Sequence, residues 1–366
     1  MSVASEPVSV SSELAGVIRA AIMDAGGWLP FDRFMALALY APNLGYYANA
    51  SLKFGLMPAS GSDFVTAPEM SPYFGRALAV QVAQALQASG SDTVIEFGAG
   101  SGALAAQLLE ALGDAVRHYT IVEVSASLRQ RQQQRLASYA PRVTWLDALP
   151  PSINGVLVGN EVLDAMPAQL LHFDGAQWFE RGVEMQGAGF TWSDRPTALR
   201  PPVIAPFAPG TVTELQAQAQ AWITTVAAHL TRGVIILIDY GFPEAEYYLP
   251  QRRGGTLMCH HAHQADSDPL VDVGLKDISV HVDFTALALT AQAAGMDVLG
   301  YTSQARFLIN CGLVAMLEQA SLAERTMAQR LMAEHEMGEL FKVIAFARDC
   351  RFEPVGFRSG DRTHRL

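Results

Sequence analysis

From residue 93 onward, short apolar runs alternate with longer amphipathic stretches, which is the pattern of a parallel sheet covered by helices on both faces. The apolar runs predict strands at 93–97, 119–124, 143–146, 156–159 and 234–239, and the stretches between them predict helices at 101–112, 125–138 and 211–231. Beyond residue 283 we expect a helix near 284–294, a strand at 296–301, helices over about 305–340 and a last strand at 342–347. The predicted fold class is therefore α/β.

Three other parts of the chain do not follow this alternation. The first 90 residues predict helices at 12–25, 31–40 and 72–89 around an ordered, aromatic-rich loop at 43–68. The segment 170–195 predicts a hairpin around the turn Asp174-Gly175, inserted between the fourth and fifth strands. The segment 240–283 reads as a long polar and aromatic loop, and a loop of that length inside a compact domain is usually functional.

Composition limits the classes of partner. The 366 residues carry 25 Lys and Arg against 36 Asp and Glu, and this net charge of −11 with no basic cluster disfavours nucleic acid. No window holds the roughly 20 apolar residues that membrane insertion requires. Residues 1–10 carry no secretion signal and the three cysteines are too few and scattered for a disulfide framework, so we expect a cytoplasmic protein. A hydrophobic fraction of 50% also points weakly to a homodimer.

The strongest local motif is the run 94–102, Val-Ile-Glu-Phe-Gly-Ala-Gly-Ser-Gly, between a predicted strand and a predicted helix. Gly98, Gly100 and Ala103 satisfy the dinucleotide pattern, and Glu123 after the next strand is placed to bind ribose hydroxyls. Glu96 favours S-adenosylmethionine instead, because an acid at that position suits a ligand with a sulfonium and an ammonium group. A glycine-rich turn without a ligand is disfavoured because Glu96 would then be buried without a partner. A nicotinamide or flavin oxidoreductase stays open as the alternative.

Further polar residues follow the next strands, where ligands of open α/β sheets bind. Asp147 is placed to hydrogen-bond an adenine amino group or its neighbouring backbone, and a role as a loop or N-cap acid is equally compatible. Asn160, Glu161 and Asp164 are expected to face the transferable methyl group, although helix capping would also explain Asp164. The run 239–242, Asp-Tyr-Gly-Phe, contributes another polar wall.

Histidines gather in two places. The run 259–263, Cys-His-His-Ala-His, suggests a metal, but no second ligand cluster at zinc spacing exists and we expect no metal site. His281 precedes Asp283 by two residues, so it is a candidate general base oriented by a carboxylate. An N-cap role for Asp283 beside an incidental histidine is the alternative.

Seven segments of the chain together resemble the MidA-type methyltransferase family, whose mitochondrial members are arginine methyltransferases that assist the assembly of respiratory complex I. The matching segments are 31–47, 63–75, 96–102, 160–167, 239–242, 255–257 and 277–284. Two departures are Ser62, where the family tends to have glycine, and a loop at 255–277 that looks shortened. The second departure concerns the substrate more than the cofactor.

The resemblance implies a Rossmann-like, seven-stranded methyltransferase sheet that binds S-adenosyl-L-methionine. It implies an N-terminal helical cap at 1–90, a cofactor-binding half at 91–167, an inserted hairpin subdomain at 168–210 and the rest of the sheet at 211–366 with the substrate loop 240–283. The cofactor-binding residues expected from motif and resemblance together are Glu96, Gly98, Gly100, Gly102, Glu123, Asp147, Asn160, Asp63 and Thr66, the last two from a segment that closes over the cofactor.

The implied acceptor is the guanidinium of a protein arginine, with a respiratory complex subunit as one candidate partner. A guanidinium stays protonated in proteins, so carboxylates are needed to clamp it and to help remove a proton. Glu161 is the first candidate for that clamp and Asp164 the second, with His281 as the proton acceptor. The alternative from another class is an assembly chaperone that binds a partner protein and retains the cofactor site only structurally.

Overall fold

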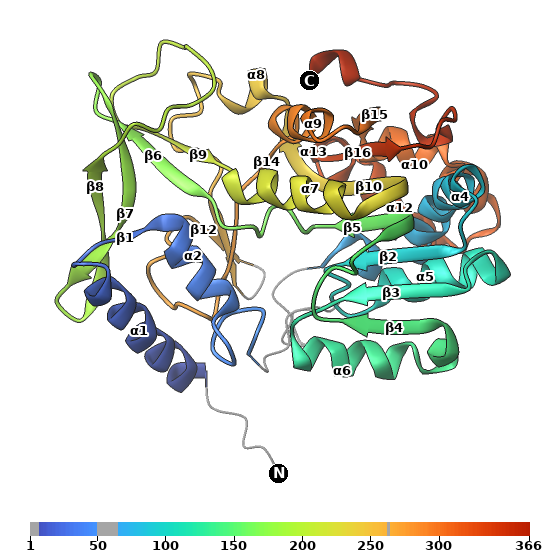
Figure 1. Cartoon of the computed structure of the whole chain (residues 1–366), viewed down its shortest axis with the longest axis horizontal. Helices are drawn as coiled ribbons and strands as arrows, with labels where there is room; N and C mark the ends of the chain where they lie inside the picture. The colour runs from blue at the N-terminus through green and yellow to red at the C-terminus, as the bar shows by residue number, and fades with distance from the viewer. Residues whose placement is uncertain (1–6, 50–64, 262–263) are drawn as a thin grey trace. The chain divides into compact units, whose positions relative to one another are not determined.

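The computed structural model describes residues 7–49, 65–261 and 264–366, and it divides into two units, each built around its own sheet (Figure 1). The large-sheet unit comprises Val65–Val162, Ala221–Pro243 and Phe284–Leu366. The small-sheet unit comprises Met1–Phe64, Leu163–Gln220 and Glu244–Asp283. None of the helices in the described ranges combines the length and apolarity that a membrane span needs.

Seven strands follow one another across the large sheet in the order β15-β16-β10-β5-β2-β3-β4. Their bounds are β2 Thr93–Phe97, β3 His118–Val122, β4 Val143–Leu146, β5 Ile153–Asn160, β10 Leu230–Phe242, β15 Asp297–Ser303 and β16 Phe341–Arg348. The neighbours from β10 to β4 pair in parallel, whereas β16 is antiparallel to both β10 and β15. The predicted α/β class is confirmed, and the seven strands of this path match the expected methyltransferase sheet.

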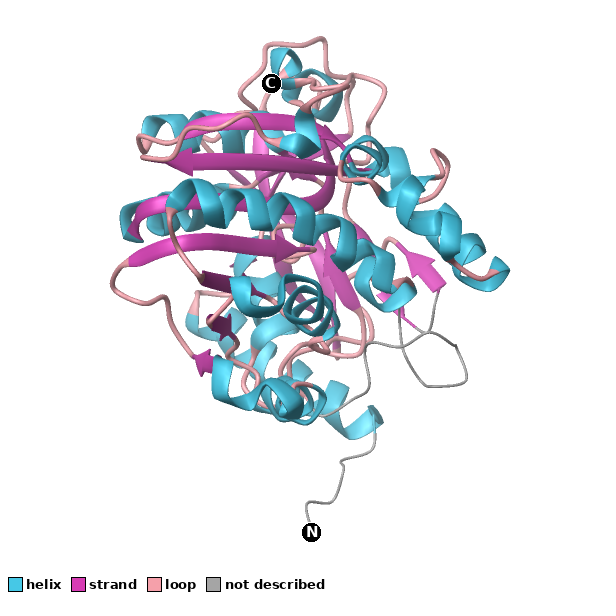
Figure 2. Cartoon of the chain, turned by 90° about the vertical axis from the view of Figure 1, so that its right-hand side faces the viewer, coloured by secondary structure: helices cyan, strands magenta, loops and turns pink. Residues whose placement is uncertain are grey.

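Helices cover both faces of this sheet (Figure 2). They are α3 Ala67–Met70, α4 Pro72–Ser89, α5 Ala103–Leu112, α6 Ala126–Arg135, α7 Ala217–His229, α9 Phe284–Ala293, α10 Gln304–Asn310, α11 Leu313–Met316, α12 Leu322–Met332 and α13 Met337–Leu340. The bounds of α4 follow from its caps: the Ser71 hydroxyl accepts a hydrogen bond from Tyr73 N, and Gly90 ends the helix at φ +67°.

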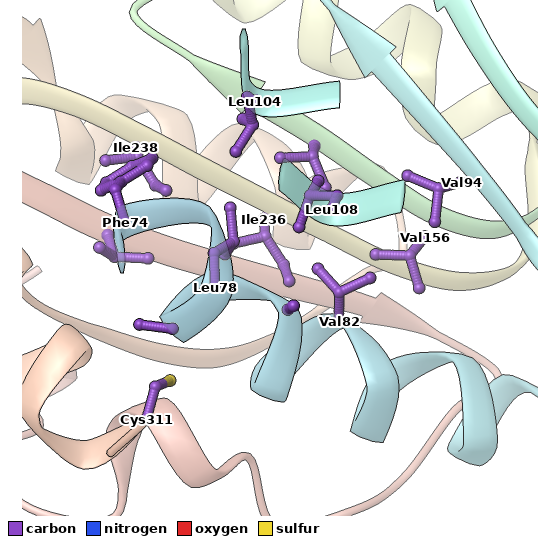
Figure 3. Packing of buried hydrophobic residues seen from close by; sticks show 14 of the residues in the cluster. Phe74, Leu78, Val82, Val94, Leu104, Leu108, Val156, Ile236, Ile238 and Cys311 are labelled. Carbon is purple, nitrogen blue, oxygen red and sulfur yellow. The ribbon is translucent and has the colours of Figure 1, made fainter. Parts of the chain in front are cut away.

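Alternate residues of the central strands point to opposite faces of the sheet, and both sets are buried. Ile236 and Ile238 of β10 pack in one cluster with Phe74 and Leu78 of α4 and Leu108 of α5 (Figure 3). The intervening residues at 235 and 237 are equally buried on the other face. Burial of every residue from 233 to 239 of this strand explains why the sequence shows a continuous apolar run here and no alternation.

The small-sheet unit contains antiparallel strands in the order β1-β7-β6-β9, with β8 paired to β7. The elements are α1 Pro7–Asp24, β1 Leu29–Pro30, α2 Phe31–Tyr40, β6 Gln169–Phe173, β7 Trp178–Gln186, β8 Gly189–Pro196 and β9 Thr211–Leu215. The predicted hairpin is present as β6 and β7. Its turn is held by Asp174, whose Oδ1 accepts from the backbone N–H groups of Ala176 and Gln177 at 2.7 and 2.8 Å.

Two sequence-based predictions are wrong here. The helix expected at 211–231 begins only at residue 217, because 211–215 form β9 and pair with β6. The loop expected at 240–283 contains α8 Glu244–Tyr247, β11 Met258–His261, β12 Gln264–Asp266, β13 Asp277–Ser279 and β14 Val282–Asp283, with a three-stranded sheet in the order β12-β11-β13.

A buried carboxylate fixes this segment to β9. Glu214 is fully buried, and its Oε1 accepts hydrogen bonds from the backbone N–H groups of Thr256 and Leu257 at 2.6 and 3.1 Å. Its Oε2 accepts from the Tyr247 hydroxyl at 3.2 Å, and burial raises the pKa of the Glu214 carboxyl. These bonds depend on long-range pairing, which local hydrophobic pattern does not reveal.

Candidate functional site

The loop between β2 and α5 has a backbone that only glycine adopts readily. Gly98, Gly100 and Gly102 have φ values of +62°, +51° and +81°. Space is also limited, because a Cβ at Gly98 would lie 3.0 Å from Cγ2 of Val162. The turn leads directly into the N-terminus of α5, where backbone N–H groups are available to a ligand.

Glu123 follows β3 at the same end of the sheet, and its carboxylate is fixed in place. It is 7% exposed, its Oε1 accepts from Ser125 N at 2.8 Å, and its backbone N–H donates to Leu146 O at 2.9 Å. Burial raises the pKa of this carboxyl above its ordinary value. A carboxylate has about four lone-pair positions, so Glu123 can also accept from the hydroxyls of a ribose.

Gln132 of α6 connects these two features, and sequence reasoning missed it. The side chain is fully buried, and its Nε2 donates to Gly100 O at 2.9 Å and to Oε2 of Glu123 at 3.0 Å. Its Oε1 accepts from Nε1 of Trp145 in β4 at 3.0 Å. In the sequence, Gln132 is only the first of three consecutive glutamines, which gives no signal of this role.

Glu96 is the second-last residue of β2 and is 2% exposed. Burial raises the pKa of its carboxyl from 4.5 to about 7, although a hydrogen bond from the Tyr119 hydroxyl at 2.6 Å opposes the shift. The expectation that Glu96 would lack a partner in the absence of a ligand is therefore wrong. The neighbouring strand β3 supplies that partner.

A second cluster that the sequence did not reveal joins the glycine loop to α3 and α6. Nη1 of Arg135 donates to Oε1 of Glu69 at 2.8 Å and to Oγ of Ser101 at 2.7 Å, and the Ser101 hydroxyl also bonds to Glu69. Thr66 immediately precedes α3 and makes no side-chain capping bond. Asp63 lies outside the described residues, so its expected place over the cofactor stays a prediction.

Asn160 is the last residue of β5, and Glu161 follows it. Nδ2 of Asn160 donates to Oε1 of Glu161 at 2.8 Å, and the Glu161 backbone lies in the left-handed region at φ +54°. The strained turn is held from β10, because Glu161 N donates to Ile238 O at 2.9 Å and Val162 N donates to Oδ2 of the buried Asp239 at 3.1 Å. Strain that neighbouring elements maintain in this way is typical of functional residues.

Asp147 is an exposed member of the predicted set. Its side chain is 87% exposed and lies 4.0 Å from Nη2 of Arg129. Its expected contact with adenine stays a prediction.

Asp164 and His281 belong to the small-sheet unit, whereas Glu161 belongs to the large-sheet unit. Asp164 is 5% exposed, and its carbonyl accepts from Val280 N at 3.0 Å. The backbone of His281 is held on both sides, because its N–H donates to Oγ1 of Thr256 at 3.0 Å and its carbonyl accepts from Nε2 of Gln216 at 2.7 Å. The small-sheet unit therefore places Asp164 beside the strand segment that leads into His281.

The histidine run at 259–263 is only partly described, because residues 262 and 263 lie outside the described ranges. Cys259 is buried in β11, and burial raises the pKa of its thiol to about 12. Across the described residues, no three His, Cys, Asp or Glu side chains gather in the way a metal ion requires.

Sheet order, glycine loop and the buried acid after β3 together define a Rossmann-like protein that binds an adenosyl cofactor at the carboxyl ends of its parallel strands. The chain belongs to the family described as "Putative S-adenosyl-L-methionine-dependent methyltransferase", whose model matches residues 77–302. The cofactor is therefore S-adenosyl-L-methionine, and the nicotinamide or flavin alternative is set aside. The loop glycines and Glu123 fit this cofactor.

Solved structures and characterised relatives agree with the family. A crystal structure from Burkholderia thailandensis, described as a "likely methyl transferase" bound to S-adenosyl-homocysteine, is 48% identical, with a TM-score of 0.94 and 98% of each chain covered. The protein named arginine methyltransferase NDUFAF7 homolog, mitochondrial, is 25% identical in Caenorhabditis elegans, covering 92% of this chain and 88% of that protein. Its Drosophila melanogaster counterpart is 27% identical, covering 93% and 86%. The resemblance to the MidA-type family is confirmed, and the chain is a methyltransferase that uses S-adenosylmethionine.

Proposed function

We propose that the acceptor of the methyl group is the guanidinium of an arginine in a protein substrate. The observation that carries this proposal is Glu161 at the carboxyl end of β5. Its backbone is held at φ +54°, and its carboxylate accepts a hydrogen bond from the Asn160 side chain. The relatives named as arginine methyltransferases support it from outside the structure. A respiratory complex subunit is the first substrate to test.

The bound cofactor supplies an activated methyl group on a sulfonium, so the chain's own residues have to orient the nucleophile and manage its proton. A carboxylate pairs with two N–H groups of a guanidinium in a fork geometry, which orients the third nitrogen. In the proposed reaction a nitrogen–carbon bond forms as the carbon–sulfur bond breaks, with its electron pair passing to sulfur, and one guanidinium proton leaves. Glu161 is the proposed clamp. The roles expected for Asp164, as a second clamp, and for His281, as the proton acceptor, stay predictions.

The test compares Glu161→Gln with the wild-type protein and with Glu334→Gln, a change at an exposed residue of the same unit. Each protein is incubated with isotope-labelled S-adenosylmethionine and host lysate, and mass spectrometry locates the label. We expect label on arginine in the wild type and in Glu334→Gln, and a loss of at least 100-fold in Glu161→Gln with cofactor affinity kept within about threefold.

Three results would contradict the proposal. Label on another residue type or on a small molecule would remove arginine as the acceptor. A wild-type rate in Glu161→Gln would remove Glu161 from the clamp. A wild-type protein that binds cofactor but never yields S-adenosylhomocysteine with any extract would instead favour the assembly chaperone.

A further inference from the structure

Gln132 has the geometry of a residue that acts on the cofactor site through other residues. It bonds to three parts of the large-sheet unit that are far apart in sequence: the glycine loop at Gly100, the acid at Glu123 and the indole of Trp145. Solvent cannot reach the hydrogen-bond donors and acceptors of this amide, because the side chain has no exposed surface. Its three bonds to protein are therefore the ones that orient it.

The direction of each bond is fixed by chemistry. Trp145 can only donate, so its indole N–H requires the amide oxygen of Gln132 on that side. The amide nitrogen must then face Gly100 O and Glu123 Oε2, which can only accept. Trp145 thus selects the orientation in which Gln132 presents both of its N–H groups to the glycine loop and to the acid.

We propose that Gln132 is a positioning residue for S-adenosylmethionine, with Trp145 as the group that sets its orientation. It holds the glycine loop and the Glu123 carboxylate at a fixed separation before the cofactor arrives. A site that is already arranged loses less conformational freedom on binding, so the effect falls on cofactor affinity. The methyl acceptor plays no part, and this inference stands whatever the acceptor is.

Gln132→Met tests the proposal, because methionine keeps the length of the side chain and removes all three hydrogen bonds. We expect the dissociation constant of S-adenosylhomocysteine, measured by titration calorimetry, to rise about 10- to 100-fold, since one of the lost bonds goes to a charged acceptor. The KM for S-adenosylmethionine should rise by the same factor. Turnover at saturating cofactor should change less than about threefold, because Gln132 touches no reacting atom.

A matched control is available in the same unit. Gln81 of α4 is 1% exposed, donates Nε2 to Gln84 Oε1 at 3.2 Å and accepts from Gly356 N at 2.8 Å. Gln81→Met therefore removes a buried glutamine and its hydrogen bonds without touching the glycine loop or Glu123. Both variants should lower the melting temperature, because each removes buried hydrogen bonds, but Gln81→Met should leave the dissociation constant of S-adenosylhomocysteine within twofold of wild type.

A second variant keeps the test decisive if Gln132→Met does not fold. Trp145→Phe keeps an aromatic ring and removes only the donor that orients the Gln132 amide, so the expected loss of affinity is smaller, about two- to tenfold. Equal cofactor affinity in Gln132→Met and Gln81→Met, or wild-type affinity in Trp145→Phe when Gln132→Met is unfolded, would overturn the proposal. A fall in turnover with unchanged KM would also overturn it.

Discussion

The buried carboxyl of Glu96 should make the stability of this protein depend on pH in a direction opposite to that of an acid whose pKa is lowered on folding, such as one in a salt bridge. Its pKa rises from 4.5 to about 7 on folding, chiefly because burial withdraws water from the charged form. Between those two pH values the folded chain holds a proton that the unfolded chain has lost. The free energy that this group contributes to folding is therefore fully present below about pH 4.5 and is lost as the pH rises toward 7. Above about pH 7 it changes little.

The magnitude follows from the width of that interval. Each pH unit of difference between folded and unfolded pKa corresponds to about 1.4 kcal/mol, so ionisation of Glu96 lowers the free energy of unfolding by about 3 kcal/mol at pH 8. Most of that loss falls between pH 5 and pH 8. Such a cost is a large fraction of the total stability of an ordinary domain.

The variant Glu96→Gln removes the titration and keeps the packing. An amide stays neutral at every pH, and its oxygen can still accept from the Tyr119 hydroxyl, which now lies 2.6 Å from Oε2. We expect the free energy of unfolding of the variant to increase relative to wild type by about 2 to 3 kcal/mol between pH 5 and pH 8. Urea unfolding of both proteins without cofactor, followed by tryptophan fluorescence at four pH values, measures this difference.

A control separates Glu96 from the rest of the chain's charge. Glu334→Gln removes one exposed carboxylate from the same unit, so it should differ from wild type by a nearly constant amount across the range. If the difference between Glu96→Gln and wild type were also constant with pH, Glu96 would not titrate between pH 4.5 and pH 7 in the folded protein, and the reasoning from burial would be wrong.

Three further predictions concern the remaining fixed groups. Gly102→Ala and Gly90→Ala, at φ +81° and +67°, should each lower the unfolding free energy by about 1 to 2 kcal/mol in urea, but only Gly102→Ala should weaken S-adenosylhomocysteine binding in calorimetry. Glu123→Gln should raise the dissociation constant of that ligand at least tenfold by the same method, because ribose hydroxyls lose a charged acceptor; an unchanged constant would remove it from the ribose site. Glu214→Ala should cost about 2 to 4 kcal/mol in urea unfolding and speed hydrogen exchange at 256–257, where two N–H groups lose their acceptor.

Hydrophobic pattern predicted the large sheet well because its central strands are buried on both faces. The bounds of β2, β4, α2 and α4 coincide with the predicted ranges, since apolar runs, prolines and glycines mark them locally. The small-sheet unit was predicted less well. Its strands β9 and β11–β13 contain polar residues, and their backbone groups find partners only after long-range pairing.

The candidate site likewise contains residues that could be predicted from the sequence and residues that could not. The glycines and Glu123 could be predicted because they follow strand ends, which a parallel sheet brings to one edge. Gln132 and Arg135 could not, because polar residues on an amphipathic helix normally indicate a solvent-exposed face. Only the folded structure shows Gln132 fully buried and turned toward the glycine loop.

The charge of Glu96 alone does not identify a ligand. A buried acid without a partner would require a cationic ligand, but Tyr119 already donates to this carboxyl within the sheet. The acid could therefore persist in a fold that binds no cation. A stronger inference comes from the combination of three left-handed glycines with a second acid, Glu123, that is fixed by backbone donors and retains acceptor capacity. Neither feature is needed to complete the sheet, so a bound adenosyl group accounts for both more directly than sheet stability does.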